Sequence, residues 1–218
     1  MTNRLLVEIY SYSILLASVI GAVRFKVILE SYRPFIYAVW IALLNEICST
    51  ITISIFKNDA INNNIYTLAD YIFIILLFMR WDESGYKKNF LRILLIGGIL
   101  IWVTDNLILH SLRTVSSYFR IIYGVIVVFL SIEEFNKVLF TEIRHTYKNA
   151  KLIICLSFMI AYTYQAILEV FGVFSGLFSN SFYITLYVIL FYINLLTNLL
   201  YALAMLWAPT KRQFTLPY

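Results

Sequence analysis

Charged residues are scarce in this chain: they make up 13% of its 218 residues, whereas 61% are hydrophobic. A soluble domain carries about 25% charged and about 45–50% apolar residues. With a mean hydropathy of +0.82, the composition excludes an ordinary water-soluble domain and predicts a polytopic membrane protein. The net charge of +5 does not indicate nucleic-acid binding, because the basic residues fall in short loops and form no binding patch.

Histidine and cysteine are also scarce, with two of each. His110 and His145 are too few for a bundle haem pair or a multi-histidine zinc centre. Cys48 and Cys155 have neither CxxC nor metal-ligand spacing, so we expect both to be buried thiols. No phosphate-binding loop or dinucleotide fingerprint occurs. The sequence does not exclude an enzyme, but no catalytic set can be named, and we expect no metal and no cofactor.

Proline and glycine rarely interrupt the apolar runs. The three prolines, Pro34, Pro209 and Pro217, lie at or beyond the ends of these runs. The pair Gly97–Gly98 is interpreted as a site where two helices pack closely. Transporters often break their helices at proline or glycine to free backbone groups for a substrate. The scarcity of such breaks therefore favours binding or sensing over transport.

Seven apolar segments are candidates for membrane-spanning helices, each of which needs ~20 mostly apolar residues. They cover about 5–23, 35–56, 64–79, 91–109, 117–139, 152–172 and 182–206. No connection between them is long enough for a separate soluble domain. We therefore predict an all-α fold, with residues 1–218 forming one transmembrane domain of seven helices.

The distribution of lysine and arginine predicts the orientation of these helices. Thirteen of the 17 basic residues fall on one side of the predicted membrane, in the connections 24–34, 80–92 and 137–151 and in the tail. Cytoplasmic loops are enriched in lysine and arginine. We expect the amino terminus outside, the carboxyl terminus in the cytoplasm, and a multi-pass location in the cytoplasmic (inner) membrane.

Polar side chains inside the apolar segments indicate the candidate site. Glu46 lies at the centre of the second segment, where an acidic residue costs roughly 2.5 to 3.5 kcal/mol on insertion scales. Such a group should face protein or a water-filled cavity. The expected pocket residues are Glu46, Asp70, Asp105, Asn106, Arg120, Tyr162, Gln165, Glu169, Tyr187, Asn194 and Asn198. The predicted orientation places Asp70, Asp105, Asn106, Arg120, Tyr162, Gln165 and Glu169 towards the outer half of the membrane. This clustering on several helices predicts a polar pocket that opens outward.

Two features of this pocket have alternative explanations. In the last segment Tyr187, Phe191, Asn194, Asn198 and Tyr201 share one helical face, and this face is explained equally well by hydrogen bonding between helices. Arg120 has two readings: its side chain extends outward to headgroups as an anchor, or turns inward to Asp105 and Glu169. In the pocket itself, we expect Asp70, Asp105, Glu46 and Gln165 to face one another.

Three short motifs resemble a known group of proteins. They are Arg24–Phe25–Lys26 after the first segment, Asn45–Glu46 in the second, and the pattern N-x-x-x-N-x-x-Y from Asn194 to Tyr201. In these motifs the chain resembles a family of small, uncharacterised seven-helix membrane proteins of Bacteroidota-type bacteria. The resemblance covers the whole chain. It implies the seven-helix fold and assigns no activity.

Two function classes follow from these observations, and a third makes no use of the pocket. The first is a membrane protein that binds or senses a small polar or cationic ligand in the outward pocket. The second is an ion- or proton-coupled transporter of small solutes that uses the same acids. The third is a structural subunit of a membrane complex. The lipid bilayer is the first partner, and the basic inner loops are expected to meet a cytoplasmic or membrane protein.

Overall fold

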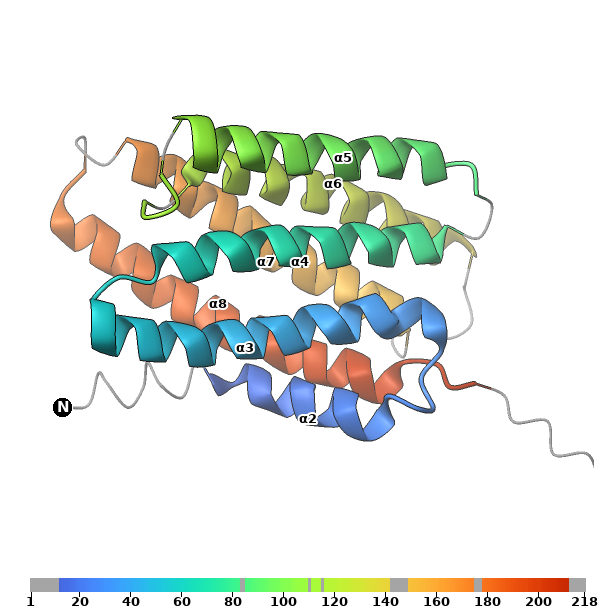
Figure 1. The fold of residues 1–218 in the computed structure, drawn as a ribbon. Helices are drawn as coiled ribbons and strands as arrows, with labels where there is room; N and C mark the ends of the chain where they lie inside the picture. Colours follow the sequence, from blue (N-terminus) through green and yellow to red (C-terminus); the bar gives the residue numbers. More distant parts are fainter. Residues whose placement is uncertain are drawn as a thin grey trace, which may run out of the picture.

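The computed structural model describes residues 12–82, 85–109, 111–114, 116–141, 149–174 and 178–211. The described residues form seven α-helices, as predicted: α2 (Ile14–Arg24), α3 (Arg33–Phe56), α4 (Ala60–Trp81), α5 (Lys88–Val103), α6 (Ser117–Thr141), α7 (Ala150–Val173) and α8 (Asn180–Trp207) (Figure 1). A 3₁₀ turn, Glu30–Tyr32, precedes α3, and a π-helical segment, Thr104–Leu109, continues α5. In this part of the chain the only β-type pairing is one isolated bridge between Ile28 and Thr210.

Consecutive helices run in opposite directions, so their connections gather at two ends of the bundle (Figure 1). One end, called the basic end here, carries the segments 25–32, 85–87 and 208–211 and residue 82, together with the ends of the helices that flank them. The opposite end carries the connection 57–59 and the segments that lead into α6 and α8. α6 packs against α7, α3 against α4, and α8 against both α2 and α7.

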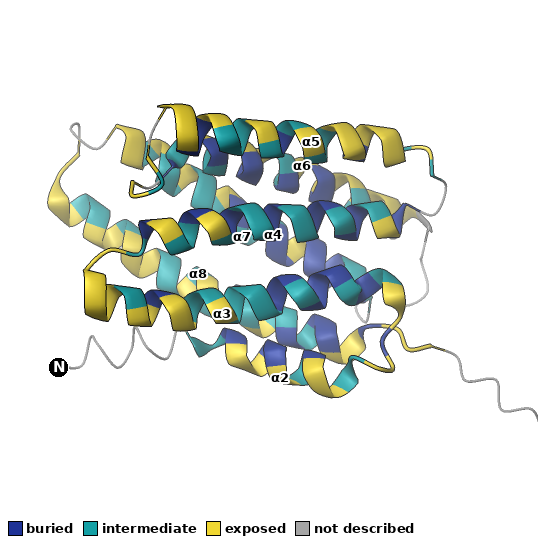
Figure 2. Cartoon of the chain, viewed as in Figure 1, coloured by how far each residue is buried: buried dark blue, intermediate teal, exposed yellow. Residues whose placement is uncertain are grey.

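Five helical segments are long and apolar enough to cross a membrane, which confirms the prediction of a multi-pass membrane protein. They are Glu30–Phe56, Ala60–Trp81, Lys88–Leu109, Ala150–Val173 and Asn180–Trp207. α6 is of comparable length but carries Arg120 near its start and Glu133, Glu134 and Lys137 near its end. Exposed positions occur along all the helices of the bundle (Figure 2). Many of the exposed residues are large and apolar, such as Val23, Ile93 and Phe129.

The helix boundaries differ from the predicted ones where polar groups extend a helix. α4 begins at Ala60 rather than near residue 64, because Asn62 and Asn64 continue the helix while their side chains bond to neighbouring segments. The fourth predicted helix is α-helical only to Val103 and then π-helical. Residues 5–11 of the first predicted helix lie outside the described residues.

An aromatic cluster fills the bundle towards the basic end. Phe35, Phe78 and Phe158 are all buried, and the ring of Phe158 lies 6.1 Å from that of Phe35 and 6.4 Å from that of Phe78. Trp81 extends the cluster, with its ring 5.7 Å from that of Phe78. Ring centres at these separations are typical of aromatic side chains in a close-packed protein interior.

Two expectations about packing are met only in part. Cys155 is buried, but Cys48 is exposed on α3 and so corrects the expectation of two buried thiols. Gly98 packs against the ring of Tyr71 on α4, whereas Gly97 has no neighbour within 4 Å of the position that a Cβ would occupy. The close approach of α4 and α5 therefore depends on one glycine of the pair.

Candidate functional site

A cavity of about 560 Å³ lies in the half of the bundle away from the basic end. Its walls come from α3, α4, α6, α7 and α8, with Ile14 of α2 at its edge. Among the predicted pocket residues, those that line it are Glu46, Asp70, Arg120, Tyr162, Gln165, Glu169, Tyr187, Asn194 and Asn198. Side chains that are 140 or more positions apart in the sequence thus share one space.

Asp70 is buried in the middle of α4 and is bonded to two tyrosines. The hydroxyl of Tyr123 on α6 and that of Tyr162 on α7 each lie 2.6 Å from Oδ2 of Asp70. The two hydroxyl oxygens are themselves 2.8 Å apart. Three helices therefore meet at one carboxyl oxygen, which lines the cavity.

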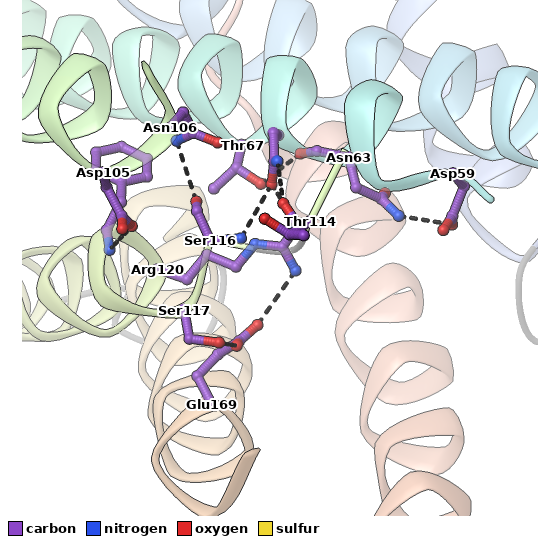
Figure 3. A network of polar contacts seen from close by, with 12 residues as sticks. Asp59, Asn63, Thr67, Asp105, Asn106, Thr114, Ser116, Ser117, Arg120 and Glu169 are labelled. Carbon is purple, nitrogen blue, oxygen red and sulfur yellow. Dashed lines mark hydrogen bonds and ion pairs between the residues drawn. The ribbon is translucent and has the colours of Figure 1, made fainter. Parts of the chain in front are cut away.

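Arg120 turns inward rather than outward, which excludes the anchor reading in this structure. Its Nη1 lies 3.2 Å from Oε1 of Glu169 on α7, and both side chains are largely buried, at 12% and 14% exposure. Ser117 donates a second hydrogen bond to Glu169, with its Oγ 2.7 Å from Oε2 (Figure 3). The pair ties the start of α6 to the carboxyl-terminal part of α7 at the wall of the cavity.

Asn64 connects this ion pair to the loop that precedes α6. Its Oδ1 accepts a hydrogen bond from Nη2 of Arg120 at 3.4 Å, and its Nδ2 donates to the carbonyl of Thr114 at 2.8 Å. Trp102 donates its indole N–H to the backbone carbonyl of Asn64 at 2.9 Å. The side-chain amide of Asn64 therefore links α4 both to α6 and to the loop that precedes α6.

Asp105 and Asn106 do not line the cavity, which corrects their assignment to the pocket. Oδ2 of Asp105 accepts a hydrogen bond from the backbone N–H of Phe119 at 2.8 Å. The first N–H groups of a helix have no partner within the helix and attract a carboxylate. Asn106 donates to Oγ of Ser116 at 3.1 Å (Figure 3). Both residues fix the entry into α6, so Asp70 and Asp105 do not face one another.

A cluster of amides joins α3 to α4 beside Glu46. Nδ2 of Asn62 donates to Oδ1 of Asn45 at 2.7 Å and to Oγ of Ser49 at 2.9 Å. Nδ2 of Asn45 in turn lies 3.2 Å from Oδ1 of Asn63, which also lines the cavity. The amide cluster satisfies polar groups that would otherwise be costly in an apolar setting.

The polar face of α8 divides between the cavity and a neighbouring helix. Tyr187, Asn194, Asn198 and Tyr201 all line the cavity. Asn198 also donates to Oγ of Ser13, just before α2, at 2.8 Å. The interhelical reading of this face therefore holds for Asn198, while its neighbours present polar groups to the cavity.

Sequence reasoning missed Tyr66, Asn63 and Tyr123 as parts of the site. Tyr66 and Asn63 precede Asp70 by four and seven positions, so they share its helical face. Tyr123 follows Arg120 by three positions on α6 and also shares its face. The signal was therefore present in helical spacing from the two charged residues. Residue type does not single out these three, because tyrosine and asparagine are also common in ordinary interhelical contacts.

The aromatic cluster described above lies between the cavity and the basic end. Tyr201 forms the boundary, because it lines the cavity and packs edge-on against Phe35 with ring centres 5.3 Å apart. The arrangement is therefore a cavity in one half of the bundle and a dense aromatic layer in the other.

Among the described residues, no three histidine, cysteine, aspartate or glutamate side chains are close enough to hold a metal ion together. Comparisons with known protein families, with curated proteins and with solved structures found no match to this chain.

Proposed function

We propose that this protein is an integral membrane binding or sensing protein, and that its cavity holds a small cationic ligand. The observation that carries the proposal is the charge of the cavity wall: the described lining residues include Glu46, Asp70 and Glu169 but only one cation, Arg120. Cavities for small molecules typically measure about 300–1,000 Å³, and the cavity volume of about 560 Å³ falls in this range.

The one cation of the cavity wall is paired with an acid. Arg120 and Glu169 lie 3.2 Å apart, so their charges offset each other. Glu46 and Asp70 then contribute the acidic character of the remaining wall. Four tyrosines, Tyr66, Tyr162, Tyr187 and Tyr201, also line the cavity. Aromatic faces attract organic cations, so an ammonium group attached to a small apolar body suits this lining.

The orientation belongs to the same proposal. We infer seven spans, an amino terminus outside and a carboxyl terminus in the cytoplasm of a bacterial inner membrane. Lys26 and Lys87 in the described loops and Lys88 at the start of α5 support it, because they lie at the end away from the cavity. The cavity then faces outward, and the basic loops face a cytoplasmic or membrane protein partner that reads the bound state. The family resemblance is compatible with this view and adds no activity.

A proton-coupled transporter is the second candidate, and the contacts of Asp70 favour it specifically. A carboxyl group at mid-bundle depth, bonded to two tyrosines, is typical of proton-handling sites in membranes. The aromatic cluster argues in the other direction, because it separates the cavity from the basic end. A role as a structural subunit would make no use of the cavity at all.

Calorimetric titration of the purified protein in lipid nanodiscs tests the proposal with two probes of similar size. Tetramethylammonium carries a charge, and tert-butanol does not. Saturable binding is expected for tetramethylammonium only, and Glu46→Gln should weaken it by about tenfold or more, which equals about 1.4 kcal/mol. Glu133→Gln is the matched control, because this half-exposed carboxyl pairs with Lys87 at the basic end.

Two results would contradict the proposal. Equal binding of both probes would show that charge plays no part in recognition. Equal weakening by Glu46→Gln and Glu133→Gln would show that the measured binding does not involve the cavity.

A further inference from the structure

Three short contacts form a nearly equilateral triangle at the cavity wall. Oδ2 of Asp70 lies 2.6 Å from the hydroxyl oxygens of both Tyr123 and Tyr162, and these two oxygens are 2.8 Å apart. All three residues are buried. Each edge has the length of an O–H···O hydrogen bond, so each edge requires its own hydrogen.

Counting hydrogens identifies the protonation state that fits this triangle. Each tyrosine hydroxyl carries one hydrogen, and an ionised aspartate carries none. An ionised Asp70 therefore leaves two hydrogens for three edges. If both hydroxyls donated to the carboxylate, the two tyrosine oxygens would face each other at 2.8 Å without a hydrogen between them. A protonated Asp70 supplies the third hydrogen, and each oxygen then donates once and accepts once.

We propose that Asp70 is a proton-binding site and that it carries its proton in the conformation described here. The charges around it are consistent with a neutral carboxyl: the salt bridges of the described residues do not include Asp70, and the nearest cavity cation, Arg120, is bonded to Glu169. The other titratable groups that line its cavity are Glu46 on α3, Tyr66 on α4, Arg120 on α6, Tyr162 and Glu169 on α7, and Tyr187 and Tyr201 on α8. The one positive charge among them, on Arg120, is paired with Glu169 and not with Asp70.

The proton on Asp70 can be exchanged for a bound cation in the cavity, and this step rests on the proposed function. A cation that enters beside Asp70 is stabilised by the carboxylate and not by the neutral acid. Binding then breaks the O–H bond of Asp70, and the proton leaves through the cavity to the surrounding water while the cation takes its place. Because the proton and the cation compete, cation affinity should rise about tenfold per pH unit until Asp70 is fully ionised.

Infrared difference spectroscopy of the protein in nanodiscs tests the proton site without any ligand. Raising the pH from neutral should remove a C=O stretching band of a protonated carboxylic acid, and Asp70→Asn should lack this band. The amide NH2 of an asparagine carries two hydrogens, so it can donate to both tyrosine hydroxyls while one hydroxyl donates to the other, and the triangle can persist in the variant. Glu46→Gln is the matched control that should retain the band, because it removes a different carboxyl group from the same cavity.

A second variant keeps the test decisive if Asp70→Asn does not fold. Tyr162→Phe removes one hydrogen bond to Asp70 and should shift the frequency of the same band. A pH-dependent band that is unchanged in both variants, or the absence of any such band in the folded wild type, would overturn the proposal.

Addition of tetramethylammonium at neutral pH separates this inference from the proposed function. Loss of the Asp70 band on binding supports the exchange. A band that is present but unaffected by a bound probe would overturn the exchange and leave the proton site and the cation site standing. Failure of the probe to bind while the band is present would count against the proposed ligand class alone.

Discussion

Arg120 shows how a single charge can organise one end of the bundle. Its guanidinium joins Glu169 of α7 and Asn64 of α4, although all three residues lie in largely apolar helices. Removing one partner of a buried ion pair costs roughly 3 to 5 kcal/mol, because the other charge is then left without compensation. The cost of the pair itself is much smaller than the cost of breaking it.

Arg120→Ala should therefore lower the thermal stability of the protein in detergent, and Glu169→Gln added to it should restore part of the loss. We expect a coupling energy of about 1–3 kcal/mol in the double-mutant cycle. Asp105→Asn provides the matched control: it should destabilise by itself, because Asp105 bonds to the N–H of Phe119, but should not rescue Arg120→Ala. Additive behaviour of Arg120 and Glu169 would contradict the pair.

Asp105, like Asp70, is a carboxyl group within a largely apolar segment. From its flanking turns it is as strong a pocket candidate as Asp70, yet it satisfies the start of α6. An unpartnered helix terminus and a polar cavity both attract a carboxylate. The choice between them depends on where the π-helical segment ends, and this position is not encoded in the apolar pattern.

At the level of elements, the contact between α4 and α5 depends on the absence of one side chain. A Cβ on Gly98 would lie 2.2 Å from Cε1 of Tyr71. The ring cannot easily move away, because Tyr71 is fully buried and its hydroxyl donates to the carbonyl of Leu94 at 2.5 Å. Tyr71 also packs edge-on against Tyr123, with ring centres 5.3 Å apart, so a shift there would reach the cavity wall.

Gly98→Ala should destabilise the protein by about 1–3 kcal/mol or more, the usual cost of overpacking a tight core. Gly97→Ala is the control, because a Cβ at this position meets nothing within 4 Å and alanine favours a helix more than glycine does. Thermal unfolding in detergent measures both. Equal effects of the two substitutions would show that α4 and α5 are not in close contact at Gly98.

At the scale of the whole molecule, the first and last described helices are joined at the basic end. The guanidinium of Arg24 donates to the carbonyls of Met205, Leu206 and Ala208, and so satisfies the end of α8. Beyond it, Leu29 donates its N–H to the carbonyl of Pro209 at 2.9 Å. The segment after α8 is therefore held beside the loop that follows α2.

The orientation predicts opposite results for reporters at the two ends of the bundle. A phosphatase that is active only in the periplasm should be inactive when fused after Tyr218 and active when inserted into the 57–59 loop. A reporter that is active only in the cytoplasm should give the reverse pattern. Full phosphatase activity at the carboxyl terminus would overturn both the orientation and the outward direction of the cavity.

The sequence by itself determined the membrane class, the seven helices and the half of the bundle where polar groups gather. These properties follow from composition and from local apolar runs, because a helix satisfies its own backbone and needs only a long apolar segment to lie in lipid. The spacing of residues along α8 also sufficed to place Asn194 and Tyr201 on one face.

Only the tertiary structure decided which polar groups meet. Arg120 pairs with Glu169 rather than with Asp105. Tyr123 and Tyr162, from two other helices, form hydrogen bonds to Asp70. The amide of Asn64 joined a loop about fifty positions later in the chain. Such choices depend on the rotation and depth of each helix against its neighbours. Those are set by packing contacts such as Gly98 against Tyr71, which no periodicity within a single helix specifies.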